Sequence, residues 1–262
     1  MIRALQTAAS GMMAQQLNLD NIANNLANAS TAGFRERRLQ FEDLLYQSLV
    51  APGSAATQQT TAVGLQIGLG TRTDASEILR SEGEMQSTGN PLDLAIQGEG
   101  FFQVQQPDGT IAYTRSGEFH LDSQGNLVTS EGSPLQPSIT IPAGATSINI
   151  GSDGTVSVTM PGQSNAQQVG TITLALFPNP GGLNSIGRNL FTPTTASGDP
   201  VVGNPGGSQG LGTLQQGMLE GSNVSVVDEF VQMILAQRAY EANSKVVSTA
   251  DQMYQTTNNM KQ

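Results

Sequence analysis

The sequence predicts an α+β fold, in which N- and C-terminal helices pair as a coiled-coil-like hairpin and a mainly antiparallel β domain is inserted between them. Two observations predict it. Apolar residues recur with helical spacing at both ends of the 262-residue chain, and short apolar–polar alternations separated by Gly-containing turns fill the middle. The expected boundaries are 1–34 for the N-terminal helix, 35–72 for an extended connecting segment, 73–220 for the β domain and 221–262 for the C-terminal helix.

The N-terminal helix follows from a heptad-like spacing of apolar residues that starts at Ile2 and continues to Leu26. Gly33 ends the pattern and is expected as the residue just beyond the helix. Beside the apolar stripe lies a stripe of amides, because Asn18, Asn21, Asn25 and Asn28 are spaced by three or four residues. Asn is a mediocre helix former, so this stripe needs a reason.

Three interpretations of the amide stripe remain open: a solvated face, a face packed between subunits, and a face lying on a membrane. Solvated helix faces usually carry Glu and Lys, and membrane-surface helices are rich in Lys and Arg. The only ionisable residue between Ala4 and Phe34 is Asp20. Because an uncharged amide can be buried once it is hydrogen-bonded, we favour packing between subunits.

The segment 46–72 is rich in Gly, Ala, Ser and Thr, and we expect extended chain there. Hairpins are predicted around "QPDGT" (106–110) and around Gln124-Gly125-Asn126, with further strands in 148–158 and in 170–177. The density of Gly, Pro and Asn in 178–217 predicts loop or irregular structure.

The C-terminal helix is expected to begin after Ser225 or Asn223 as N-cap, with Asp228 and Glu229 near its start. The sequence pattern allows the two terminal helices either to pair with each other or to pack back onto the β domain. A lone helical pair has little core, so pairing would require neighbouring copies for stability.

Composition excludes several classes of function. The net charge of −10 argues against a nucleic-acid or anionic-membrane partner. The chain has no Cys, which removes thiolate chemistry and Cys-based metal sites. Neither a secretory signal pattern nor a bilayer-spanning apolar run is expected.

No catalytic, cofactor-binding or metal-binding residues are predicted. The single histidine, His120, alternates with Phe119 and Leu121 and is expected on the solvated side of a strand. Asp122, Gln124 and Asn126 imitate the start of a calcium loop, but Ser133 occupies the position of the required acid, so a turn is expected. Gly98-x-Gly100 lacks the third glycine of a dinucleotide loop.

The terminal segments closely resemble the signatures of a known family. "AQQLNLDNIANNLANASTAGF" (14–34) and "SNVSVVDEFVQMILAQRAYEANSKVVSTADQM" (222–253) resemble the two ends of the axial proteins of the bacterial flagellum, the rod and hook family. Residues 89–104 and 113–129 resemble the core of its β domain. Two departures are mild: Arg35 stands where Lys is common, and Ala29 where a larger apolar residue is often found.

The resemblance implies a structural, non-enzymatic subunit without cofactor. Segments 41–53 and 64–72 look most like the distal rod; a proximal-rod subunit of similar length is the alternative. A secreted hydrolase or binding module is the rival class. The implied partners are further copies of the chain in a helical homopolymer, proximal-rod proteins, hook or hook-junction subunits, surrounding outer-ring proteins and the flagellar export apparatus.

The resemblance also implies a rod spanning the periplasm, export without a cleaved signal peptide, and a distal rod stiffened by the segment around 46–65. It makes residues of both helices candidates for subunit packing, as a hypothesis. These are Asn18, Asn21, Asn24, Asn25, Leu26, Asn28, Gln237, Arg238, Tyr240 and Asn243.

Overall fold

The computed structural model describes residues 2–50, 55–56, 59–60, 64–162, 165–207 and 210–260. The chain divides into two compact units, each built from separate stretches of sequence. Unit 1 comprises 1–27, 37–77 and 225–262, and unit 2 comprises 28–36 and 78–224. The expected α+β class, with a helix at each end and antiparallel strands between, is confirmed.

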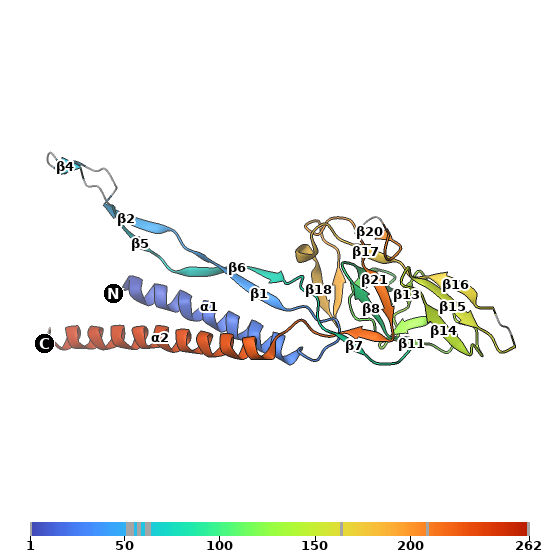
Figure 1. The fold of residues 1–262 in the computed structure, drawn as a ribbon. Helices are drawn as coiled ribbons and strands as arrows, with labels where there is room; N and C mark the ends of the chain where they lie inside the picture. Colours follow the sequence, from blue (N-terminus) through green and yellow to red (C-terminus); the bar gives the residue numbers. More distant parts are fainter. Residues whose placement is uncertain are drawn as a thin grey trace. The chain divides into compact units, whose positions relative to one another are not determined.

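Unit 1 is built on helix α1 (Ile2–Ala27) and helix α2 (Val226–Asn259), which lie side by side and antiparallel (Figure 1). Small residues make this contact close: Ala14 and Ala236 are buried. A Cβ added at Gly11 would sit 2.8 Å from the Nδ2 atom of Asn243. The expected helical hairpin is therefore confirmed, with alanine and glycine at its seam.

Two-stranded ribbons complete unit 1 (Figure 1). Strand β1 pairs with β6, β2 pairs with β5 in antiparallel register, and β3 pairs with β4. Their bounds are β1 (Arg37–Asp43), β2 (Tyr46–Val50), β3 (Ala55–Ala56), β4 (Gln59–Thr60), β5 (Leu65–Gly68) and β6 (Thr71–Ile78). The expectation of extended chain is confirmed for 46–50 and 64–72; residues 51–54, 57–58 and 61–63 lie outside the described residues.

Unit 2 is a β domain whose largest sheet has the strand order β18-β19-β10-β9-β17-β20, with β13 also pairing with β9. Smaller sheets join β14-β15-β16, β11-β12, β8-β21 and β7-β22. The bounds are β7 (Met85–Ser87), β8 (Leu94–Gln97), β9 (Phe101–Gln105), β10 (Ile111–Thr114), β11 (Phe119–Leu121), β12 (Leu127–Thr129), β13 (Leu135–Gln136), β14 (Ser147–Ile150), β15 (Thr155–Thr159), β16 (Gln167–Thr171), β17 (Leu174–Leu176), a 3₁₀ turn η1 (Pro180–Gly182), β18 (Asn184–Gly187), β19 (Leu190–Thr192), β20 (Val201–Gly203), β21 (Thr213–Gln216) and β22 (Met218–Glu220).

The predicted hairpins are confirmed with their turns. Strands β9 and β10 pair antiparallel across "QPDGT", where Gly109 adopts φ +86°. Strands β11 and β12 pair around Gly125, and the strands expected in 148–158 are present as β14 and β15. The Asp122 carboxylate accepts hydrogen bonds from the backbone N–H groups of Gln124 and Asn126, both at 2.8 Å, so it caps a turn as expected. His120 is exposed on β11, also as expected.

Two expectations about local structure were wrong. Segment 178–217 contains strands β18 to β21 as well as loops, because short apolar pairs such as Leu190-Phe191 fill buried positions between its turns. Gly33 does have a positive φ of +67°, but α1 ends at Ala27. The Gly33 N–H instead donates to the backbone oxygen of Glu220 at 2.8 Å.

The main core lies in unit 2, between its sheets. Phe102 and Phe119 are fully buried and meet edge to face, with ring centroids 5.1 Å apart. Most other members of this core lie on strands, where alternation places them on inward faces; Ile139 and Ile172 lie in the connections between strands. The other members include Leu94, Ile96, Val104, Leu127, Leu135, Ile139, Val156, Ile172, Leu174 and Leu214.

Candidate assembly surface

Helix α2 begins with an apolar surface that faces away from α1. Ser225 is the N-cap, and its side chain accepts a hydrogen bond from the Asp228 N–H, which confirms one of the two expected caps. In the next turns, Val227, Val231 and Ile234 share one helical face and are 72%, 51% and 57% exposed. Phe230 and Leu235 flank this face and are also exposed. We call these five residues the α2 apolar face.

The opposite face of α2 already packs against α1 within the chain. Glu229, Ala236 and Ala250 are its buried residues, and they lie about half a turn away from the α2 apolar face. A helix that is apolar on two opposite faces is typical of a buried helix. The first turns of α2 therefore have the composition of an internal helix while one face lies at the surface of unit 1.

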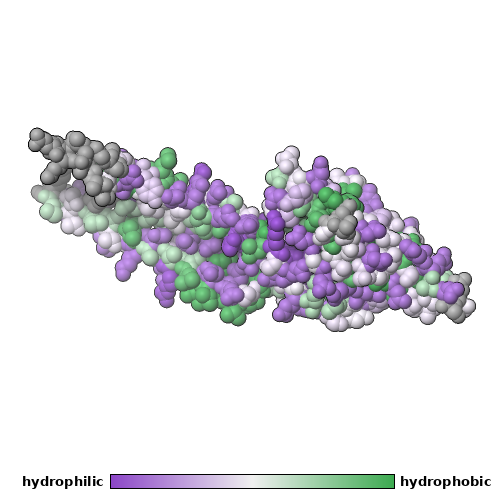
Figure 2. All heavy atoms as spheres, turned by 45° about the horizontal axis from the view of Figure 1, so that its top comes forward, coloured by the Kyte–Doolittle hydropathy of each residue, from purple (hydrophilic) through white to green (hydrophobic). Residues whose placement is uncertain are grey.

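The β2–β5 ribbon adds a second exposed apolar surface to unit 1. Leu45, Leu49, Leu65 and Ile67 are all exposed, as is Tyr46, whose ring lies against Gly68. An isolated two-stranded ribbon is marginal in water. Figure 2 shows hydrophobic residues, in green, at the surface on the helix-bearing part of the chain. Exposed apolar area on this scale marks an interaction surface.

The amide stripe of α1 has partners inside the chain. Asn25 is 1% exposed, and its Nδ2 atom donates to Glu229 Oε1 at 2.8 Å and to the backbone oxygen of Arg37 at 2.9 Å. Its Oδ1 atom accepts from the Arg37 N–H at 3.1 Å, and Asn21 also donates to the Arg37 oxygen. Two asparagines of the stripe thus join α1, β1 and the first turn of α2.

The carboxyl group that Asn25 contacts is electrostatically unusual. Burial raises the pKa of Glu229 above its ordinary value, the Asn25 hydrogen bond acts in the opposite direction, and the neighbouring Asp228 charge raises it further. An amide suits position 25 because it can donate to the Glu229 carboxylate without adding charge. This arrangement accounts for part of the asparagine content of α1.

The other predicted packing residues occupy varied positions. Asn18, Leu26 and Asn28 are half-buried, and Asn243 is half-buried over Gly11. Asn24, Gln237 and Tyr240 are exposed, as is Arg238, which forms an ion pair with Glu241 at 2.9 Å. Contact of these eight residues, and of Asn21 and Asn25, with neighbouring copies stays a prediction. The residues of the α2 apolar face are not among the ten predicted packing residues.

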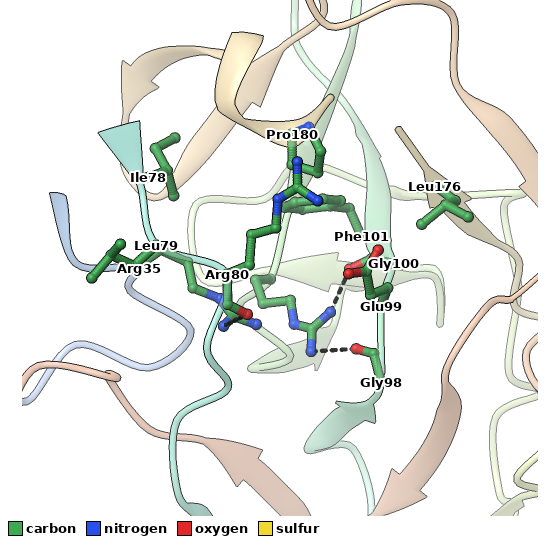
Figure 3. Close-up of a pocket in the computed structure, with 11 residues that line it drawn as sticks. Arg35, Ile78, Leu79, Arg80, Gly98, Glu99, Gly100, Phe101, Leu176 and Pro180 are labelled. Atoms are coloured by element: carbon green, nitrogen blue, oxygen red, sulfur yellow. Dashed lines mark hydrogen bonds between the residues drawn. The ribbon is translucent and has the colours of Figure 1, made fainter. Parts of the chain in front are cut away.

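Unit 2 contains a charged cluster that the sequence did not predict. Glu220 is buried and forms ion pairs with Arg35 at 2.8 Å and with Arg115 at 2.6 Å. Arg115 also donates to the backbone oxygens of Gly98 and Gly100, both at 2.7 Å, as the dashed lines in Figure 3 mark. Burial lowers the pKa of Arg35, while the Glu220 charge raises it. The three residues are far apart in the chain, so no local motif marks them.

The pocket beside this cluster offers little to a ligand. It encloses about 50 Å³ and is lined by Arg35, Phe101, Leu176 and Pro180, among others (Figure 3). Small-molecule sites usually enclose roughly 300 Å³ or more. Within the described part of the chain, no group of three or more His, Asp or Glu side chains could hold a metal ion. The described helices also include none that is long and apolar enough to cross a bilayer.

Comparison with known families gives three matches along the chain. Residues 5–35 match a model described as flagella basal body rod protein. Residues 95–158 match the D1 domain of the flagellar hook protein FlgE/F/G. Residues 215–260 match the C-terminal region of the flagellar basal body rod FlgEFG proteins. The matched regions include nearly all of α1, the central β strands and the whole of α2.

Individual relatives extend over the whole chain. The flagellar basal-body rod protein FlgG of Borreliella burgdorferi is 48% identical over 100% of this chain and 99% of its own length. The protein of the same name from Bacillus subtilis is 41% identical over 100% of both chains. The Bacillus subtilis flagellar hook-basal body complex protein FlhP is 28% identical, also over 100% of both. Of these two Bacillus proteins, the chain is thus more similar to FlgG.

Proposed function

This chain belongs to the family of flagellar basal-body rod proteins, and we propose that it polymerises as the distal-rod subunit, forming a rigid tubular drive shaft that transmits motor torque from the proximal rod to the hook. Its function is structural, as a component of the basal-body rod. The full-length similarity to FlgG proteins supports the placement within the rod.

The observation that carries the proposal is the α2 apolar face. Side chains such as Val231 and Ile234 are more than half exposed although they lie on a helix whose other side is packed. Burying a Val or Ile side chain is worth about 1.5–3 kcal/mol. A head-to-tail contact that repeats without closing builds a helical filament, so many copies can cover this face in every subunit. The exposed apolar surface of the β2–β5 ribbon also supports assembly into a polymer.

The proposed partners follow from this placement. Further copies of the chain cover the α2 apolar face, proximal-rod proteins join the polymer at one end, and hook or hook-junction subunits join it at the other. Outer-ring proteins surround the rod in the periplasm. We propose that the chain reaches that compartment through the flagellar export apparatus without a cleaved signal peptide. Nucleic acid and the lipid bilayer are not among its partners.

Electron microscopy of basal bodies from cells that lack this gene tests the placement. A shortened rod without hook or outer rings is the result expected for a distal-rod subunit. A rod that is missing altogether would reassign the chain to the proximal rod. Intact flagella would overturn the structural role itself, and would revive the alternative of a secreted binding module. Complementation with the intact gene is the control.

A further inference from the structure

Three stretches of chain that are distant in sequence meet in unit 2. The backbone N–H of Gly33 donates to the Glu220 oxygen at 2.8 Å, and that of Leu79 donates to the Glu36 oxygen at 2.9 Å. Asn223 joins all three stretches: its Oδ1 atom accepts from the Glu36 N–H at 2.6 Å, and its Nδ2 atom donates to the Ser81 oxygen at 2.9 Å. The segment that follows α1 is thereby bound to the segment that precedes α2.

Buried charge strengthens the same junction. Arg35 and Arg115 are 8% and 3% exposed, and Glu220 lies between them. Arg35 also donates to the backbone oxygens of Arg80 and Ser81. A buried ion pair with additional hydrogen bonds tolerates no loss of a partner, because the remaining charge would be left without compensation. Arg35 therefore holds the segment after α1 in one place.

Gly33 allows this segment to approach closely. Its φ is +67°, and a Cβ added there would lie 2.6 Å from the backbone carbon of Arg115. A side chain at this position would meet both backbone strain and a steric clash that no rotamer change relieves. Gly33, Arg35 and Glu220 together form what we call the junction clasp.

We propose that the junction clasp couples the pairing of the terminal helices to the folding of unit 2. The residues that link the clasp to the helices are few: 28–32 lead from α1 to Gly33, and 221–224 lead from Glu220 to the cap of α2. With the clasp closed, α1 and α2 are therefore held at a high effective concentration. This inference concerns a single chain and is independent of the proposed polymerisation.

The size of the coupling follows from the length of free chain. Effective concentration falls roughly as the −3/2 power of linker length. Opening the clasp frees the segment after α1 from unit 2, which lengthens the free chain between the helices. The effective concentration of the two helices should then fall severalfold.

The chain has no cysteine, so an engineered pair reports helix pairing directly. The variant Gly11→Cys/Asn243→Cys places thiols on α1 and α2 where a Cβ at Gly11 lies 3.3 Å from the Asn243 Cγ. The fraction of intramolecular disulfide in glutathione buffers gives the effective concentration of the two thiols. Hydrogen exchange of the β9–β10 amides shows in parallel whether unit 2 remains folded.

In this background, Gly33→Ala and Arg35→Gln each open the clasp by a different route, one steric and one electrostatic. Gly89→Ala is the matched control, because Gly89 has φ +71° with no atom within 4 Å of its added Cβ. We expect a severalfold lower effective concentration in both clasp variants and no change in the control. An unchanged value in the clasp variants, whether or not the β9–β10 amides stay protected, would overturn the proposal.

Discussion

Asn25 on α1 donates a hydrogen bond of 2.8 Å to Glu229 on α2, across 204 residues of sequence. The same amide group also donates to the backbone oxygen of Arg37 and accepts from its backbone N–H, at the start of β1. One uncharged side chain thus fixes three elements of unit 1. Loss of this amide should therefore affect the helical hairpin before it affects any contact between subunits.

Asn25→Asp should destabilise unit 1 by about 3 kcal/mol. The new carboxylate would lie beside Glu229 in a buried site and could no longer donate to the Arg37 oxygen. Urea unfolding followed by far-UV circular dichroism measures the change in free energy. Asn24→Asp, at the neighbouring exposed position, is the control and should cost far less. Equal stability of both variants would contradict the role given to Asn25. We also expect Asn25→Asp to impair rod assembly.

The raised pKa of Glu229 predicts a pH dependence of unit 1. Because the folded-state pKa lies above the unfolded value, folding favours the protonated form. Its contribution to stability is fully present below the ordinary glutamate pKa and is lost as the pH rises through the raised value. The urea midpoint of the wild type should therefore decline relative to Glu229→Gln over that window.

The control for this pH series is Glu241→Gln, which removes an exposed carboxylate from the same helix. Urea midpoints of the wild type, Glu229→Gln and Glu241→Gln at several pH values distinguish the contribution of Glu229 from that of Glu241. Parallel curves for the wild type and Glu229→Gln would contradict the prediction.

Arg115 should be essential to the stability of unit 2. Arg115→Lys cannot reproduce hydrogen bonds to Glu220, Gly98 and Gly100 at once, because Lys lacks the planar fork of donors. We expect a loss of about 3–5 kcal/mol in the free energy of unfolding. Arg188→Lys, in an exposed pair with Glu131, should cost at most about 1 kcal/mol. Thermal unfolding of both variants makes the comparison, and similar losses would contradict it.

Val231→Asp should abolish motility without unfolding the chain. The side chain is 51% exposed, so a charge there is tolerated in the isolated subunit but not in an apolar contact between copies. Swimming in soft agar and the unfolding midpoint of the purified protein are the two measurements. Val231→Ile keeps the position apolar, so cells that carry it should swim normally. If Val231→Asp lost both motility and folding, the loss of motility would not report on the contact between copies.

Local signals in the sequence account for the parts of the fold that were predicted. Gly109 and Gly125 mark hairpin turns because their positive φ values are needed there, and Ser225 marks a helix start because a hydroxyl can cap it. The strands within 178–217 were missed because the turn residues outnumber apolar pairs such as Leu190-Phe191, whose burial depends on pairing with β10.

The candidate sites show the same limit. Asn25 was singled out by its helical spacing, but its partner Glu229 is set by the tertiary fold. Arg35 and Arg115 form ion pairs with Glu220, from which they are separated by 185 and 105 residues of sequence. In the sequence, Arg35 stands out only as a departure from the family pattern. The α2 apolar face was not predicted, because its exposure depends on which side of α2 packs against α1.

In the proposed polymer, the α2 apolar face is buried between subunits of the rod. Electron microscopy of basal bodies from cells whose only copy carries Val231→Asp and Ile234→Asp tests this claim most directly. We predict shortened rods without hooks, from a protein that is produced and folded normally when purified. Full-length rods that carry hooks would contradict the claim.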